Sequence, residues 1–305
     1  MTYSRIFAGV ALLALLFLSG CASAPLRVLY FSKSAGWEHS VVKRADGKSS
    51  YSEQVLTGLG AKQGIEFTFT KDGSVFTPSY LAQFDVVLFY TSGDLFSAGT
   101  DNQPAMTPEG RQALFDYVAG GKGFVGLHSA SDTFLTGEHG GGNPKPTPNR
   151  YRDHGAAMDP YAKFLGGSFI RHDEQQVATA TVADANFPGF ENLGSEIKVR
   201  EEWYTLKEFA SDDHVLLVMQ AAGMKGEDYA RPPYPLAWAR LQGKGRVAYN
   251  AMGHREDVWD SAAYQSMLVG MIRWAAGRVD ADVTPNLEQV APGHATTQAL
   301  PPDVK

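Results

Sequence analysis

Cysteine is nearly absent from this chain, whose 305 residues contain only Cys21. One cysteine cannot close a disulfide within the chain or build a zinc site from several thiolates. Lipidation of this sulfur, which its sequence context predicts, would also remove the one thiol nucleophile. A single cysteine that is lipidated therefore excludes disulfide scaffolds, thiol redox motifs and cysteine hydrolases.

The N-terminal segment has the pattern of a bacterial export signal. Arg5 supplies a positive charge, residues 6–18 form an apolar run that is short for a membrane span, and Leu18-Ser19-Gly20-Cys21 matches a lipobox. We expect residues 1–20 to be removed and residues 21–26 to form a lipidated tether. Ala22 stands where an inner-membrane retention signal would have Asp, so the periplasmic face of the outer membrane is the expected location. A plain secretory signal with a chance cysteine is the alternative.

Basic residues are also few. Removal of the leader takes away Arg5, one of 27 basic side chains, and leaves 26 against 33 acidic ones, a net charge of −7. Lys43, Arg44 and Lys48 are the densest basic group, so nucleic-acid binding is not expected. A small molecule is the expected partner, the lipid is the only expected membrane contact, and the oligomeric state is left open. About 250 residues remain for folding, enough for one large α/β domain.

Strand and helix patterns alternate in the first half of the chain. Short apolar runs predict strands at 27–32, 65–70, 85–90 and 123–128, and amphipathic stretches predict helices at 50–62 and 107–119. This alternation indicates parallel βαβ units with right-handed crossovers.

The second half of the chain changes character. A Gly/Pro-rich loop at 137–152 and a short helix at 159–165 precede strands predicted at 176–182, 197–199, 215–220, 236–241 and 246–250. The pattern predicts that the last two strands form a hairpin and that residues 262–275 form a closing helix. We expect residues 277–305 to form an extended or disordered tail.

The most informative stretch runs from Gly123 to Asp132, where a buried strand stops at a histidine. Ligands of open α/β sheets collect beyond the carboxyl ends of strands, which is where His128, Ser129 and Asp132 would lie. The stretch is similar to a nucleophile elbow, but its Gly-x-Ser-x-Gly frame is missing. A serine esterase acting through Ser129 therefore stays a minor alternative.

Four of the eight histidines stand in comparable places, three of them at or after a predicted strand. Imidazoles and carboxylates are the usual ligands of zinc and similar divalent ions, so we predict a metal site from His39, His128, His172 and His254. Without a metal, the same groups could act as general acids and bases. Each histidine taken alone could instead be a hydrogen-bonded structural residue.

Acids near these histidines complete the candidate site: Asp94, Asp132, Glu201 and Glu202. In Glu201-Glu202-Trp203-Tyr204 two acids stand beside two aromatic residues, which suits a sugar site, although a solvated rim is the alternative. We predict His128, His39 and Glu202 as catalytic residues. The predicted substrate-binding residues are Asp94, Ser129, Asp132, Trp203 and Tyr204. His139 and His154 are expected to be solvated.

Six separated motifs occur in the order found in the ThuA-like (trehalose-utilisation) family, which the chain resembles over residues 27–276. They are Gly36-Trp37-Glu38-His39-Ser40, Phe84-Asp85-Val86-Val87 with Thr91-Ser92-Gly93-Asp94, Gly123-Phe124-Val125-Gly126-Leu127-His128-Ser129-Ala130, Leu165-Gly166-Gly167-Ser168-Phe169 with His172, Glu201-Glu202-Trp203-Tyr204, and Gly245-Arg246-Val247-Ala248-Tyr249 with Gly253-His254. The resemblance implies a flavodoxin-like three-layer α/β sandwich, with a mainly parallel central sheet and additional antiparallel strands in the second half.

The same resemblance implies a relation to the class I glutamine amidotransferases and a role in the use of disaccharides or keto-sugars. The elbow of those amidotransferases holds a catalytic cysteine where this chain has His128, so their reaction is not expected here. Members of the ThuA-like family often have Asp at Glu201 and a smaller or polar residue at Trp37.

Two functions follow as predictions. The first is a lipid-anchored enzyme with hydrolase, lyase or isomerase chemistry on a disaccharide or keto-sugar, with or without a divalent metal such as zinc; Asp94 and Asp132 would orient its imidazoles. The second is a non-catalytic saccharide-binding lipoprotein that serves a transporter or a partner enzyme. The second is favoured by the aromatic residues Trp37, Trp203, Tyr204 and Trp259.

Overall fold

A computed structural model describes residues 24–134 and 148–300. The leader, Cys21 and His139 lie outside the described residues. In the part that is described, no helix combines the length and the apolar character needed to cross a membrane.

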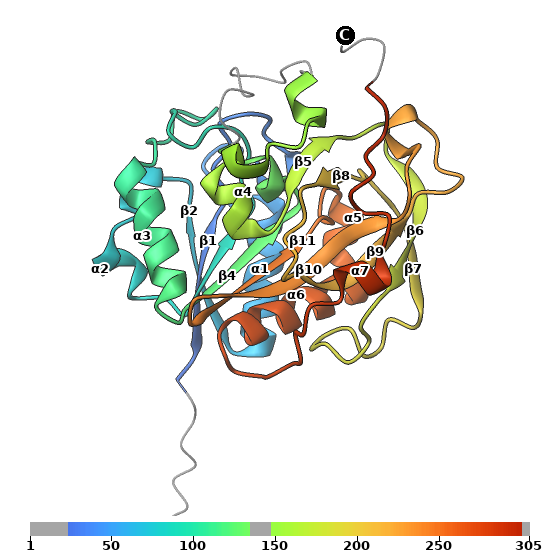
Figure 1. Ribbon diagram of the computed structural model, residues 1–305. Helices are drawn as coiled ribbons and strands as arrows, with labels where there is room; N and C mark the ends of the chain where they lie inside the picture. Colours follow the sequence, from blue (N-terminus) through green and yellow to red (C-terminus); the bar gives the residue numbers. More distant parts are fainter. Residues whose placement is uncertain (1–23, 135–147, 301–305) are drawn as a thin grey trace, which may run out of the picture.

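A nine-stranded mixed sheet runs through the molecule in the order β2-β1-β3-β4-β11-β10-β9-β6-β7 (Figure 1). Its first five strands are parallel, and their order is that of a flavodoxin-like sheet. They are β2 (Ile65–Thr70), β1 (Leu26–Phe31), β3 (Val86–Phe89), β4 (Gly123–Leu127) and β11 (Gly245–Asn250). All residues of β3 and β4 are buried, as expected of parallel strands covered on both faces.

The other four strands of this sheet are antiparallel to their neighbours. They are β10 (Tyr234–Gln242), β9 (His214–Gln220), β6 (Gln176–Val182) and β7 (Glu196–Glu201). This confirms the predicted fold class, with a parallel first half and antiparallel later strands. A separate pair, β5 (Ser168–Arg171) and β8 (Thr205–Lys207), has no counterpart in the sequence prediction.

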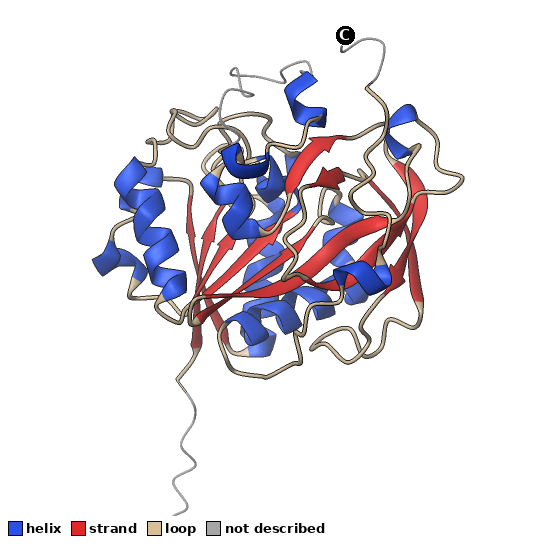
Figure 2. Cartoon of the chain, in the orientation of Figure 1, coloured by secondary structure: helices blue, strands red, loops and turns tan. Residues whose placement is uncertain are grey.

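Helices cover both faces of the sheet (Figure 2). One face carries α1 (Tyr51–Gln63), α5 (Glu256–Asp260) and α6 (Ala262–Ala275), and the other carries α2 (Pro78–Leu81), α3 (Pro108–Ala119) and α4 (Pro160–Leu165). The helix starts follow from local chemistry. Ser50 and Glu53 form a capping box at α1, and the Thr107 side chain accepts the Gly110 N–H at the start of α3.

The segment after Ala276 crosses the antiparallel half of the sheet. Most of it has no regular secondary structure, but α7 (Leu287–Val290) packs on β9. Leu287 and Ala291 are buried there against Val215 and Val218. The described part of the predicted tail, up to residue 300, therefore closes over the apolar surface of β9.

Candidate metal centre

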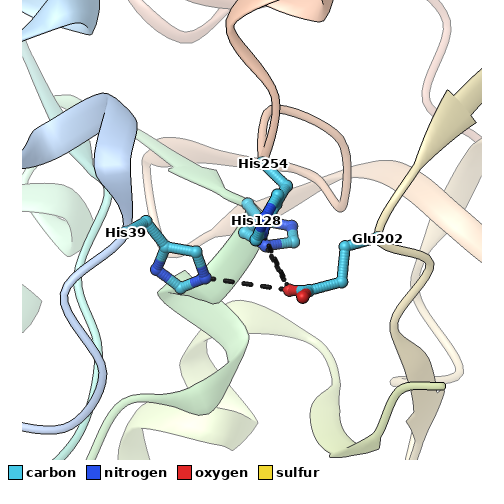
Figure 3. A group of neighbouring side chains, drawn as sticks. All are labelled: His39, His128, Glu202 and His254. Carbon is cyan, nitrogen blue, oxygen red and sulfur yellow. Dashed lines mark ion pairs between the residues drawn. The ribbon is translucent and has the colours of Figure 1, made fainter. Parts of the chain in front are cut away.

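Four side chains from distant parts of the chain meet at one edge of the sheet (Figure 3). His39, His128 and His254 follow β1, β4 and β11, whose carboxyl ends share an edge because these strands are parallel. Glu202 follows β7, which four antiparallel pairings make parallel to β11. One ligand atom from each of the four residues lies within 4.8 Å of the others.

His128 is the first residue after β4 and begins the 3₁₀ turn His128–Asp132. Its backbone φ is +43°, a region that residues with a Cβ rarely adopt. The Tyr249 hydroxyl donates to the His128 carbonyl at 2.7 Å. Two residues before His128, in β4, the space beside Gly126 is tight: a Cβ there would lie 3.0 Å from Leu165 Cδ1 and 3.2 Å from the Tyr249 ring. The sharp change from strand to turn is that of an elbow, and the side chain at this elbow is the imidazole of His128.

The tautomer of His128 is set by its main-chain partner. His128 Nδ1 lies 2.8 Å from the Ala251 carbonyl oxygen, which can only accept, so Nδ1 carries the proton. Nε2 then presents a lone pair, and it faces Oε2 of Glu202 at 3.3 Å. Neither Nε2 nor this carboxylate oxygen has a hydrogen-bond partner among the described residues. Two buried acceptors thus point at each other, an arrangement that a cation between them would satisfy.

The other two imidazoles approach the same carboxylate oxygen. His254 Nδ1 lies 2.9 Å from Glu202 Oε2, and His39 Nε2 lies 3.8 Å from it. Despite its short distance, His254 Nδ1 makes no hydrogen bond within the described chain, because the directions are unfavourable. The ring centroids of the three histidines lie 4.9–5.3 Å apart in edge-to-face contacts.

The electrostatics of the cluster favour a cation. Burial lowers the pKa of His128 to about 3 and also lowers the pKa of His39, so both rings are neutral at pH 7. Burial would raise the pKa of Glu202, but its contacts with His128, His254 and His39 outweigh this and hold the pKa well below its usual range. Burial would lower the pKa of His254, whereas its pairing with Glu202 raises it overall.

Glu201 supports the cluster from the side of His254. Its carboxylate accepts the backbone N–H groups of Glu202, Gly253 and His254 at 2.9–3.2 Å. Burial raises the pKa of Glu201 to about 7. The residue therefore fixes the main chain that carries two of the four candidate ligands.

The donor set fits a divalent metal. Three imidazoles and one carboxylate are a combination that zinc and similar ions accept. The unpartnered buried atoms of His128, His254 and Glu202 lie close together, and His39 Nε2, which is 3.5 Å from the Tyr204 hydroxyl, completes the group. His172, predicted as a ligand, lies outside this group of four. Its Nδ1 is 3.5 Å from Glu202 Oε1, its side chain is 37% exposed, and its ring stacks on Tyr204.

The predicted substrate-binding residues have different surroundings. Tyr204 is buried with its ring 4.1 Å from that of His128, so it forms a wall of the cluster. Trp203 is also buried, and its indole N–H donates to the Gln176 carbonyl, which leaves no face for a sugar. Ser129 is buried, and its hydroxyl has no hydrogen-bond partner in the described residues.

The two predicted orienting acids engage other groups. Asp94 accepts the Phe96 N–H and the Ser97 hydroxyl at 3.0 and 3.2 Å. Asp132 pairs with Arg150 at 3.3 Å. The imidazole of His128 is oriented instead by the Ala251 carbonyl, a main-chain group with no sequence signature. His154, expected to be solvated, lies 3.1 Å from the Glu208 carboxylate.

The family model described as trehalose utilisation (ThuA) matches residues 27–275. A ThuA-like protein from Bacteroides uniformis is a similar solved structure, with 21% identity, a TM-score of 0.59, and coverage of 85% of this chain and 95% of the other. Another, from Parabacteroides merdae, has 18% identity, a TM-score of 0.57, and coverage of 92% and 99%. A cytoplasmic protein from Salmonella typhimurium has 16% identity, a TM-score of 0.54, and coverage of 82% and 99%. Comparison with curated proteins gave no match.

Proposed function

The chain belongs to the trehalose-utilisation (ThuA) family, and on that premise we propose that it is a metal-assisted enzyme acting on a disaccharide or keto-sugar by hydrolase, lyase or isomerase chemistry. One observation carries the proposal. The bare Nε2 of His128 faces the Glu202 carboxylate at 3.3 Å in a buried site that two further imidazoles complete. The family description, which concerns trehalose, supports the substrate class.

Each side chain of the cluster has a role in the proposal. His39, His128, His254 and Glu202 would hold a divalent ion such as zinc, which supplies polarisation of a carbonyl or acidification of water when bound. Tyr204 excludes water on one side of His128. His172 lies beside Glu202 and reaches solvent, so its imidazole is placed to exchange a proton with a ligand.

Metal analysis of the purified protein tests the proposal. We expect about one zinc or similar ion per chain, and we expect His128→Ala and Glu202→Gln to lose both the metal and the turnover of keto-sugars. His154→Ala is the matched control, because His154 also contacts a glutamate but lies outside the cluster. A metal-free protein that binds no added zinc, together with full turnover by His128→Ala, would contradict the proposal. Saturable saccharide binding without product would favour the binding lipoprotein instead.

We further propose that Cys21 carries a lipid that holds the protein on the periplasmic face of the outer membrane. The lipobox Leu18-Ser19-Gly20-Cys21 and the residue Ala22 support this. Metabolic labelling with a fatty acid should mark the wild type, and Cys21→Ser should abolish the labelling. Unlabelled wild-type protein in the soluble fraction would contradict the anchor.

A further inference from the structure

Three loops surround the exposed side of the metal centre and are tied to one another. The loops carry His39, His172 and His254. The Ser40 hydroxyl donates to Glu256 at 2.6 Å, and Arg255 donates to the Gln175 side chain at 2.7 Å. The side chains of His39 and His128 are 4% and 0% exposed, whereas those of His254 and His172 are 17% and 37% exposed. A ligand therefore approaches from the side of His254 and His172.

Trp37 stands on the first of these loops and differs from every other tryptophan in the chain. The residue is 57% exposed, whereas the other four are at most 1% exposed: Trp203, Trp238, Trp259 and Trp274. Trp37 is two positions before His39, so its Cα lies within about 7 Å of the His39 Cα. The main chain that carries this exposed indole therefore lies within two residues of a candidate metal ligand.

The backbone that carries Trp37 is held in place. Its carbonyl accepts the Ser92 hydroxyl at 2.6 Å, and the Ala35 N–H donates to the Ser92 carbonyl at 2.8 Å. Glu38 pairs with the buried amine of Lys71 at 2.6 Å. On the other side of Trp37, a Cβ at Gly36 would lie 3.3 Å from Gly93, so the loop packs closely against its neighbour. The indole is exposed although its main chain is fixed.

We infer that Trp37 is the stacking surface for a pyranose ring of the substrate, and this inference rests on the proposed function. A pyranose presents an apolar C–H face and a perimeter of hydroxyls. The three loops around the metal centre offer the aromatic face of Trp37. They also offer carboxylate, amide and guanidinium groups, including those of Glu256, Gln175 and Arg255. The face of an indole buries such a C–H surface well, while the polar groups satisfy the hydroxyls. Trp37 thereby selects cyclic sugars over linear polyols of similar polarity.

Fluorescence quenching isolates this residue because the other four indoles are buried. With the full-length, zinc-loaded protein, acrylamide should quench mainly Trp37. Trehalose and methyl α-glucoside, but not the linear polyol sorbitol, should shield Trp37 from quenching. Trp37→Ala should raise the Kd for the shielding sugar, measured by calorimetry, roughly three- to tenfold. Trp37→Phe should restore part of the loss, and metal content should not change.

Leu241→Ala is the matched control. Leu241 is 55% exposed but lies near the end of β10, at the sheet edge opposite the metal centre. The inference is overturned if no cyclic sugar in the panel shields Trp37, or if Trp37→Ala binds the sugar as tightly as the wild type. The shielding of Trp37 and the Kd of Trp37→Ala are measured independently of the metal content and turnover of His128→Ala, so the failure of this inference can be told apart from the failure of the proposed function. Shielding of Trp37 in a protein without metal or turnover would overturn the enzyme proposal alone.

Discussion

Nε2 of His128 and Oε2 of Glu202 lie 3.3 Å apart, and each is a buried acceptor without a hydrogen-bond partner in the described residues. The Ala251 carbonyl fixes the proton on the opposite ring nitrogen of His128. Burial keeps the pKa of His128 near 3, so a second proton does not bridge the gap at neutral pH. A divalent cation shared with His39 and His254 would satisfy both atoms, and the following predictions test that proposal.

Zinc should stabilise the protein through Glu202. At a zinc concentration one hundred times the Kd, mass action adds about 2.7 kcal/mol to the free energy of unfolding. Glu202→Gln should abolish this gain, because the amide offers no negative charge to the ion. Thermal unfolding with and without zinc measures the effect. Glu208→Gln, which changes another glutamate beside a histidine, should keep the gain; an equal loss in both variants would speak against a specific site.

The elbow should strain His128 independently of any metal. Its φ of +43° is easily adopted by glycine and costs other residues about 1–2 kcal/mol. In the metal-free protein, His128→Gly should therefore be about 1 kcal/mol more stable than His128→Ala, although both lack the imidazole. Urea unfolding of the two variants measures the difference. Greater stability of the alanine variant would show that the turn is not strained.

Zinc affinity should increase with pH. Pairing with Glu202 raises the pKa of His254 in the metal-free fold, so below that raised pKa the ring holds a proton that an ion must displace. The stabilising His254–Glu202 ion pair is fully present below pH 6.5 and is lost as pH rises through the raised pKa. Below the raised pKa of His254, zinc affinity should rise about tenfold per pH unit as one proton is released, and above that pKa it should level off. Calorimetry in buffers of different ionisation enthalpy measures the proton count, and a count of zero would contradict this assignment.

Glu201 should tune the metal without touching it. Its carboxylate accepts three backbone N–H groups, including that of His254, and an amide oxygen would replace them only in part. We expect Glu201→Gln to weaken zinc binding by about 10- to 100-fold, as for other groups that orient ligands. The zinc affinity of Glu201→Asp should lie between that of the wild type and that of Glu201→Gln. Competition with a chromogenic chelator gives the Kd values, and wild-type affinity in Glu201→Gln would rule out the positioning role.

Much of the fold could be predicted from the sequence because many of its strands are apolar and clearly bounded. Apolar runs predicted the parallel strands that end at Leu127 and Asn250, and a cap predicted the helix that begins after Thr107. The pair β5 and β8 was not predicted, because these strands of four and three residues mix apolar with charged residues, whereas the equally short β3 is continuously apolar.

The candidate site was predictable in its residue types but less so in its geometry. Histidines after parallel strands must share an edge, which brings His39, His128 and His254 together. The central position of Glu202 depends on the direction of β7, which follows from four antiparallel pairings that a single sequence does not reveal. The sequence also did not reveal which aromatic residues are accessible to a ligand: Trp203 packs inside the protein, whereas Trp37 is exposed.

X-ray absorption at the zinc edge of the purified, zinc-loaded protein tests the metal centre most directly. We predict a first shell of three imidazole nitrogens at about 2.0–2.1 Å with a carboxylate oxygen at a similar distance, and no such zinc shell in His128→Ala, which loses the metal. A wild-type spectrum without imidazole scattering, or one that His128→Ala leaves unchanged, would contradict the assignment of His39, His128, His254 and Glu202 as a metal centre.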